Sequence, residues 1–176
     1  MYYFISDTHF GHQNIIKYCD RPFLSLTDMD LVLIRNWNER VQKTDTVFFL
    51  GDFCLSKSSE APNSKNFNFY RQQLNGNIIF ISGNHDNRGN KQAKTIITNI
   101  GIFYGNENIF LTHNPKYINL NYKFNFVGHV HNKWKFQIIN KCIVVNLSVE
   151  QWNYHPVTIN EIMSAYHQWR KQSCEK

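Results

Sequence analysis

The chain has 176 residues, the size of one domain that buries its own core without disulfides. Its net charge of +6 and isoelectric point near 9.1 favour an anionic partner, but the basic residues are scattered and outline no nucleic-acid groove. Four widely spaced cysteines form neither a metal knuckle nor a disulfide framework, and no apolar run approaches the length of a membrane span. We therefore expect a single domain over 1–176, in the cytoplasm and without a membrane partner.

Five short apolar runs have the length and composition of buried strands, and each leads into polar residues. In chain order they are Tyr2–Ile5, Val47–Leu50, Ile78–Ile81, Ile109–Leu111 and Phe124–Val127. Open α/β sheets place their chemistry where strands end, so the residues that follow these runs are the candidates for a site.

Helices are predicted between and after these strands. One begins at Thr27 in the capping-box pattern Thr27-Asp28-Met29-Asp30, and Thr158–Glu161 repeats that pattern at the start of a final helix ending near Arg170. Shorter helices are expected at 14–18 and 67–74, with a weaker one at 91–99. Two hairpins are expected, at 102–111 and 136–145.

The segment from Cys54 to Asn66 is rich in Ser, Asn, Lys and Pro and has no periodicity. Because it starts near a strand end, it is either a segment that grips substrate or a passive surface loop. The composition does not decide between the two.

Each strand end carries residue types that bind metal ions. The motifs, in order, are Asp7-x-His9, Gly51-Asp52, Gly83-Asn84-His85-Asp86, His113 and Gly128-His129-x-His131. Any one of them occurs by chance, but five in succession after strand-like runs rarely do. Two divalent cations about 3.5–4 Å apart can clamp a phosphate and generate hydroxide between them, and they need a bridging carboxylate. Mixed imidazole and carboxylate ligands suit Mn, Fe, Zn or Ni better than Ca.

These five blocks resemble the calcineurin-like metallophosphoesterases, whose motifs D-x-H, G-D, G-N-H-D/E, H and G-H-x-H follow the same order. The blocks span residues 7–131, and the opening Ile5–His12 and the tail Leu147–Glu150 also resemble small prokaryotic and phage members of that family. The resemblance implies a four-layer α/β/β/α sandwich, in which two mixed β-sheets pack face to face and are flanked by helices. The metals would lie at strand ends.

The resemblance also implies a role for each motif residue. Seven residues would bind the metals: the first ion by Asp7, His9 and His131, the second by Asn84, His113 and His129, with Asp52 bridging both. His85 would donate a hydrogen bond to the phosphate or protonate the leaving oxygen. The expected cofactors are two divalent ions, with Mn favoured and Fe, Ni and Zn as alternatives.

The sequence departs from the protein Ser/Thr phosphatase branch of that family just after the bridging Asp. That branch has a second Asp and an Arg there, and this chain has Phe53-Cys54-Leu55-Ser56. Without the Arg, a dianionic monoester loses a bidentate partner, so a phosphodiester is favoured. Asp86 or a backbone carbonyl would then orient His85.

Three further residues near the ligand loops are weaker candidates for substrate contact: His12, Arg21 and Arg88. For His12 the alternative is a structural place in its loop, and for the two arginines it is a solvated side chain.

The favoured function is a two-metal phosphodiesterase in which hydroxide attacks phosphorus and His85 protonates the departing alcohol. The alternatives are a phosphomonoesterase, a nuclease or processor of RNA ends or cyclic phosphates, and a non-catalytic scaffold on the same fold; the intact ligand set argues against the scaffold. A small phosphodiester or nucleotide is the expected substrate, with short nucleic acid as an alternative, and a monomer or homodimer is expected.

Overall fold

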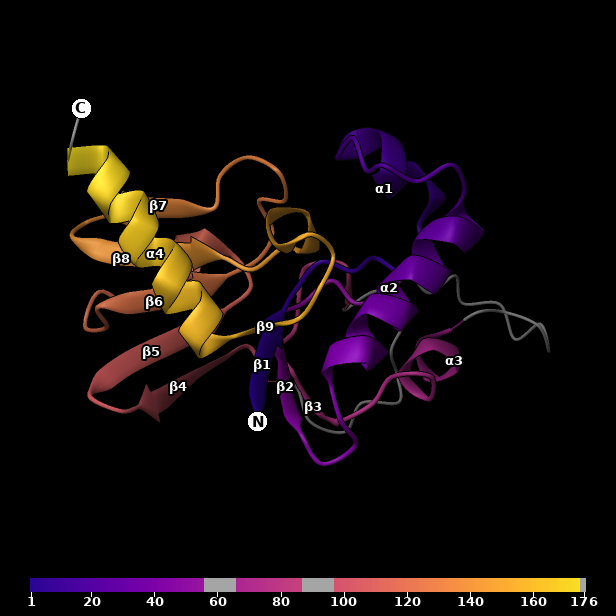
Figure 1. Cartoon of the computed structure of the whole chain (residues 1–176), viewed down its shortest axis with the longest axis horizontal. Coiled ribbons are helices and arrows are strands. Elements are labelled where there is room, and N and C mark those ends of the chain that lie inside the picture. The colour runs from indigo at the N-terminus through magenta and orange to yellow at the C-terminus, as the bar shows by residue number, and fades with distance from the viewer. Residues whose placement is uncertain (56–65, 87–96, 175–176) are drawn as a thin grey trace.

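Two mixed β-sheets form the centre of the molecule (Figure 1). The computed structural model describes residues 1–55, 66–86 and 97–174. The first sheet has the order β3-β2-β1-β9. Its strands are β1 Tyr2–Ile5, β2 Thr46–Phe49, β3 Asn77–Phe80 and β9 Val157–Thr158. The first three are parallel, and β9 runs antiparallel to β1.

The second sheet has the order β4-β5-β6-β8-β7. Its strands are β4 Asn99–Tyr104, β5 Glu107–Thr112, β6 Phe124–Val127, β7 Phe136–Ile139 and β8 Cys142–Asn146. The central strands β5, β6 and β8 are parallel, and the two predicted hairpins are confirmed as the antiparallel pairs β4–β5 and β7–β8.

The first sheet is buried on both faces, which is why its strands are almost continuously apolar. Phe4 of β1 stacks on Phe48 of β2 and meets the ring of Phe126 from the second sheet edge on, with centroids 5.4 Å apart. Ile5 and Phe49 point the other way, into a second cluster beneath the helices. Two hydrophobic cores thus hold the sheet between them.

Helices cover the outer face of the first sheet (Figure 1). They are α1 Gln13–Tyr18, α2 Leu26–Arg40 and α3 Phe67–Arg71. The predicted start of α2 at Thr27 is wrong, because Ser25 is the N-cap and its hydroxyl accepts a hydrogen bond from the Asp28 amide at 3.1 Å. The capping residue therefore lies two positions earlier. The helix predicted at 67–74 ends sooner, at Arg71.

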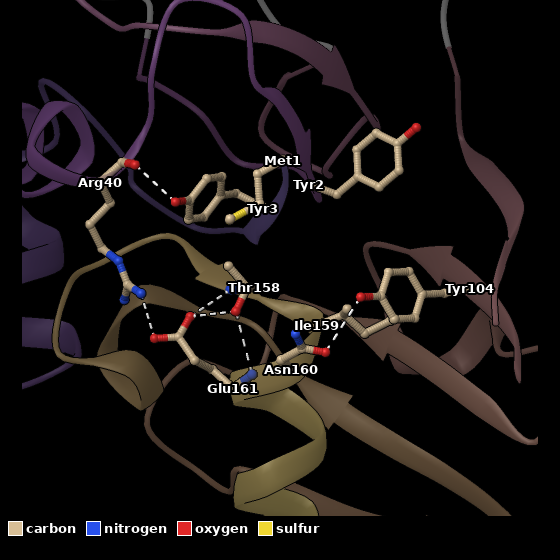
Figure 2. Close-up of a pocket in the computed structure, with 9 residues that line it drawn as sticks. All are labelled: Met1, Tyr2, Tyr3, Arg40, Tyr104, Thr158, Ile159, Asn160 and Glu161. Atoms are coloured by element: carbon tan, nitrogen blue, oxygen red, sulfur yellow. Dashed lines mark hydrogen bonds and ion pairs between the residues drawn. The ribbon is translucent and has the colours of Figure 1, made fainter.

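The final helix, α4 Ile159–Cys174, extends beyond the predicted end at Arg170. Its predicted capping box is confirmed: the Thr158 amide donates to Glu161 Oε2 at 2.8 Å, and the Glu161 amide donates back to Thr158 Oγ1 at 3.4 Å (Figure 2). Tyr166 of α4 packs edge on against Phe124 of β6, on the face of the second sheet that also meets the first sheet. The predicted class of two mixed sheets packed face to face with flanking helices is confirmed, with α4 lying beside the first sheet.

Two expectations fall largely outside the described residues: the helix at 91–99, whose last residue begins β4, and the loop at 54–66. The described residues also contain the short 3₁₀ turns η2 Pro115–Tyr117 and η3 Val149–Trp152. Within the described ranges, no helix has both the length and the apolar character needed to cross a membrane.

Candidate metal centre

The candidate ligands lie where parallel strands of both sheets end. The loops after β1, β2 and β3 carry Asp7, His9, Asp52 and Asn84, and the loops after β5 and β6 carry His113, His129 and His131. The two sets of loops are joined directly, because the His129 amide donates to Asp7 Oδ2 at 3.0 Å. Parallel strands deliver their carboxyl ends to one edge, which is the reason residues so far apart in sequence meet.

The side chains form two groups, with Asp52 between them. Asp7, His9 and His131 make one group and Asp52, His113 and His129 the other, each with its ligand atoms within 4.8 Å of one another. Asp52 Oδ2 lies 3.5 Å from Nε2 of His9 in the first group and 3.4 Å from Nε2 of His113 in its own. A carboxylate in this place can reach ions on both sides.

Asn84 joins the second group through its side-chain oxygen. This oxygen lies 3.0 Å from Nε2 of His113 and 2.8 Å from Nδ1 of His129. The other ring nitrogen of His113 donates to the Leu50 carbonyl at 2.7 Å, which turns Nε2 toward Asn84 and Asp52. All seven residues proposed as ligands are therefore brought together.

Backbone strain recurs among the same residues. Five of the seven have a positive φ: Asp7 57°, His9 50°, Asp52 59°, His129 71° and His131 49°. A non-glycine residue in this region costs about 1–3 kcal/mol and persists only where its surroundings hold it. Such strain is typical of functional sites, and here it turns the side chains inward at the strand ends.

Two motif glycines allow the loops to approach one another. Gly51 has a φ of +93°, and a Cβ there would lie 2.5 Å from Nδ1 of His113. A Cβ on Gly83 would overlap both the backbone nitrogen and Oδ1 of Asp52. The glycines of the G-D and G-N-H-D motifs are thus required by the close packing of neighbouring motifs.

We expect Gly83→Ala to displace Asp52, at a cost of about 1–3 kcal/mol in folding stability, and to reduce bound metal in both groups. Metal analysis of purified protein after loading with Mn checks this. Gly101→Ala is the control, because its added Cβ would also be crowded, but by the Tyr122 hydroxyl away from the centre. Full metal content in Gly83→Ala would show that Asp52 does not need this close contact.

The donor set fits divalent transition metals. Among the described residues, Nε2 of His9 is buried without a hydrogen-bond partner, although Asp52 and Asp7 carboxylate oxygens lie 3.5 and 3.9 Å away. Buried polar atoms nearly always have a partner, and an ion between these groups would supply one. Imidazole, carboxylate and amide oxygen ligands together suit Mn, Fe, Zn or Ni.

A sequence model of the family described as calcineurin-like phosphoesterase matches residues 2–145. The chain belongs to this family. It is 41% identical over 169 residues to the uncharacterized protein MJ1445 of Methanocaldococcus jannaschii, a match covering 92% of this chain and 88% of that protein. The crystal structure of AQ665 from Aquifex aeolicus, a protein of unknown function, superposes with a TM-score of 0.73 and 26% identity over 94% of this chain and 98% of that one.

The ionisable groups of this candidate centre shift one another's pKa values. Burial alone would raise the pKa of Asp52, but the hydrogen bond and charge of His113 outweigh it and hold that pKa well below the usual range. Burial lowers the pKa of His113, and the contact with Asp52 more than reverses this, to about 9. Since a metal binds neutral imidazole, an ion entering here must displace a proton from His113.

His85 of the G-N-H-D motif lies beside the two groups and belongs to neither of them. Its amide donates to Asp52 Oδ1 at 2.9 Å, while its imidazole is 44% exposed, with Nε2 3.9 Å from Asp52 Oδ2. The ring centroid lies 5.5 Å from that of His9. The imidazole can therefore reach a substrate that enters from solvent.

Of the two groups proposed to orient the His85 ring, Asp86 or a backbone carbonyl, Asp86 has its carboxylate engaged by backbone amides. Its carboxylate accepts hydrogen bonds from the amides of Asp52, Phe53 and Gly83, at 2.8, 3.0 and 2.8 Å. It thereby ties the loop after β2 to the loop after β3, so its role is to hold the backbone that carries Asp52.

The three weaker candidates for substrate contact have different outcomes. His12 is partly exposed, with Nδ1 3.5 Å from Nδ1 of His9, so it lies at the rim of the first group. Arg21 is wrong as a substrate contact, because its side chain is fully buried and donates to Glu150 and to the Asp7 and Thr8 carbonyls. Arg88 lies outside the described residues.

The sequence assigns no role to Glu150, the last residue of the tail Leu147–Glu150. In the structure Glu150 Oε1 lies 2.9 Å from Nδ1 of His131. The two residues are 19 positions apart on separate loops, so neither periodicity nor motif spacing indicates the contact.

Proposed function

We propose that this calcineurin-like phosphoesterase is a two-metal phosphodiesterase. The proposal depends chiefly on one observation: seven candidate ligand side chains form two groups with Asp52 between them, and the exposed His85 imidazole lies beside them. Two divalent ions, when bound, neutralise charge on a phosphate and lower the pKa of water so that it can act as a nucleophile. Mn is the favoured ion, with Fe, Ni and Zn as alternatives.

The chain's own groups divide the remaining work. The first group would hold one ion. The second group, together with Asn84, would hold the other, and Asp52 would contribute to both. His85, exposed and close to Asp52, would donate a proton to the phosphate or to the departing oxygen. Asp86 keeps the loops that carry Asp52 and His85 in register through its three amide contacts.

The residues after Asp52 support a diester over a monoester. Phe53 and Cys54 follow the bridging Asp52, in the segment where the phosphatase branch has the Asp and Arg that bind phosphate. Both side chains are buried. Phe53 packs on the rings of Phe49, Phe67 and Phe80, so this segment serves the core. A monoester carries one more negative charge than a diester and gains most from a bidentate Arg, which this segment does not offer.

The proposed substrate is a small phosphodiester or nucleotide, and the proposed form is a monomer or homodimer. A cytoplasmic location is supported by Cys19, Cys54 and Cys142, which are buried as free thiols.

The deciding experiment compares hydrolysis of an aryl phosphodiester with that of the matching monoester. The protein is stripped of metal and then given Mn, Ni, Zn or nothing. We expect activity only with added metal and a kcat/KM about tenfold or more higher for the diester, the size of one lost charged contact. A preference for the monoester would contradict the substrate assignment. Two bound ions without hydrolysis of either ester would favour the scaffold alternative.

A further inference from the structure

A buried ion pair lies directly behind the first ligand group. The Arg21 and Glu150 side chains are 0% and 4% exposed. Glu150 Oε1 accepts hydrogen bonds from Arg21 Nε at 3.0 Å and from Nη2 at 2.7 Å. A buried pair of charges is costly to desolvate unless its remaining donors are satisfied, so the other contacts of this pair show what it holds in place.

On the Arg21 side, the guanidinium grips the backbone of the D-x-H motif. Nη2 donates to the Asp7 carbonyl at 2.7 Å and Nη1 to the Thr8 carbonyl at 2.9 Å. Asp7 has a positive φ of 57° and its neighbour His9 one of 50°. Hydrogen bonds to the carbonyls between them fix a stretch of backbone that would otherwise relax.

On the Glu150 side, the carboxylate holds a ligand ring. Because a carboxylate only accepts, the 2.9 Å contact means that His131 donates from Nδ1 to Oε1. Nδ1 is thereby committed to Glu150, and Nε2, 3.8 Å from Asp7 Oδ1, is the nitrogen that is left to face the first group and to bind an ion once its proton is displaced. Histidines that bind metals are commonly fixed in this way by a carboxylate on the far ring nitrogen.

We propose that Glu150 and Arg21 are positioning residues for the first metal of this centre. Glu150 fixes the ring and tautomer of His131, and Arg21 fixes both Glu150 and the backbone that presents Asp7 and His9. This inference rests on the proposed function in assuming that His131 binds an ion. It assigns the pair to one of the two groups, since the candidate ligands that these hydrogen bonds reach are Asp7 and His131, both in the first group, while Thr8 and Met29 are not ligands.

Cys19 suggests another use for the same carboxylate. Ligand atoms of Cys19, His131 and Glu150 lie within 4.8 Å of one another, as they would around a separate ion. However, the charge of Glu150 is already matched by Arg21, and a cation placed there would face the guanidinium. We therefore assign Glu150 to positioning, and Cys19→Ser tests the alternative.

The test measures metal binding to metal-stripped protein by calorimetry with Mn, together with the visible spectrum of the cobalt-loaded form. Glu150→Ala should weaken one of the two equivalents about 10–100-fold, leave the other unchanged and alter the cobalt spectrum. Glu150→Gln, which keeps the shape and an acceptor oxygen, should lose less. Arg21→Ala should weaken the same equivalent, and the double variant should lose little more than either single one, because the pair acts as a unit.

Two control variants separate positioning from stability. Glu161→Gln removes the charge from another Arg–Glu pair, with Arg40 (Figure 2). Glu161 is bonded to Thr158 of β9 and contacts none of the candidate ligands in its described hydrogen bonds. Tyr70→Phe removes a buried hydrogen bond to Asp30, of 2.8 Å, and should lower the melting temperature. Both should bind two ions as the wild type does.

Wild-type affinity for both ions and an unchanged cobalt spectrum in Glu150→Ala would overturn the proposal. So would an equal weakening of both equivalents, or the loss of a third equivalent in Cys19→Ser. The proposed function is judged separately, on the wild type. If Glu150→Ala loses one equivalent but the loaded wild type cleaves no ester, the positioning role stands and the esterase assignment fails.

Discussion

Replacing His85 by alanine is expected to lower kcat about 10²–10⁴-fold while both metal equivalents stay bound, since this is the usual contribution of one positioned acid. The imidazole is 44% exposed and belongs to neither ligand group. Its backbone amide, which the substitution retains, is the part that holds Asp52. Steady-state kinetics on an aryl diester, with metal analysis of the same sample, measures both quantities.

The choice of leaving group sharpens this test. If His85 protonates the departing oxygen, the loss should be larger for a diester with an alkyl leaving group than for one with a readily departing aryl oxide. His167→Ala removes an exposed histidine of α4 and serves as the control. Metal lost in step with activity would instead make His85 a ligand, and an equal loss for both esters would limit it to binding the phosphate.

The second large effect is expected for Asp52→Asn, which should weaken both metal equivalents at once, by more than the 10–100-fold typical of residues outside the ligand shell. The reason is its position, because Oδ2 lies 3.5 Å from His9 in one group and 3.4 Å from His113 in the other. Asparagine keeps the shape and can still accept the His85 amide, so the lost charge is what the variant measures. Calorimetry with Mn on stripped protein provides the two affinities.

The same variant has a readout that needs no metal. The pKa of His113 is raised to about 9 against the effect of burial, largely by Asp52. Without that negative charge the imidazolium loses its partner, so the pKa should fall, as NMR titration of the stripped protein would record. Asp45→Asn, which removes a carboxylate paired with the amino terminus, should leave it unchanged. If Asp52→Asn weakens only one equivalent, Asp52 is not shared.

The strands, and the meeting of the candidate ligands at one edge, were predictable for one reason. A strand buried on both faces has a continuous apolar run, and parallel strands carry whatever follows them to one edge. The runs before Asp7 and Asp52 are such strands. Strand β9 was not predicted, because two residues that pair with β1 carry no pattern of their own.

The start of α2 shows how tertiary contacts decide between overlapping local patterns. Ser25 and Thr27 both precede an Asp by three residues, and local chemistry suits either as the cap. In the fold Asp30 is buried, and its carboxylate accepts from the Tyr70 hydroxyl and the Gly11 amide. A residue committed to the core cannot serve a capping box at the surface, so the helix begins earlier.

Arg21 and Glu150 mark the limit of sequence reasoning at the site. They are 129 positions apart, and they meet because the chain after β8 returns to the end of β1, where Ser6 and Ser148 pair. Charged residues at such a separation carry no signal of their contact. From its place near the D-x-H loop, Arg21 was expected either to contact substrate or to be solvated, and the fold buries it instead.

The division of the ligands between the sheets has a mechanical consequence. Asp7, His9, Asp52 and Asn84 follow strands of the first sheet, and His113, His129 and His131 follow strands of the second. Each group takes members from both, so an ion in either one would fasten the two layers of the sandwich together at one rim. At that rim the packing of the two sheets and the binding of ions would therefore stabilise each other. A chelator that removes the ions would weaken the contact between the two sheets at this rim, and tight binding of ions would strengthen it.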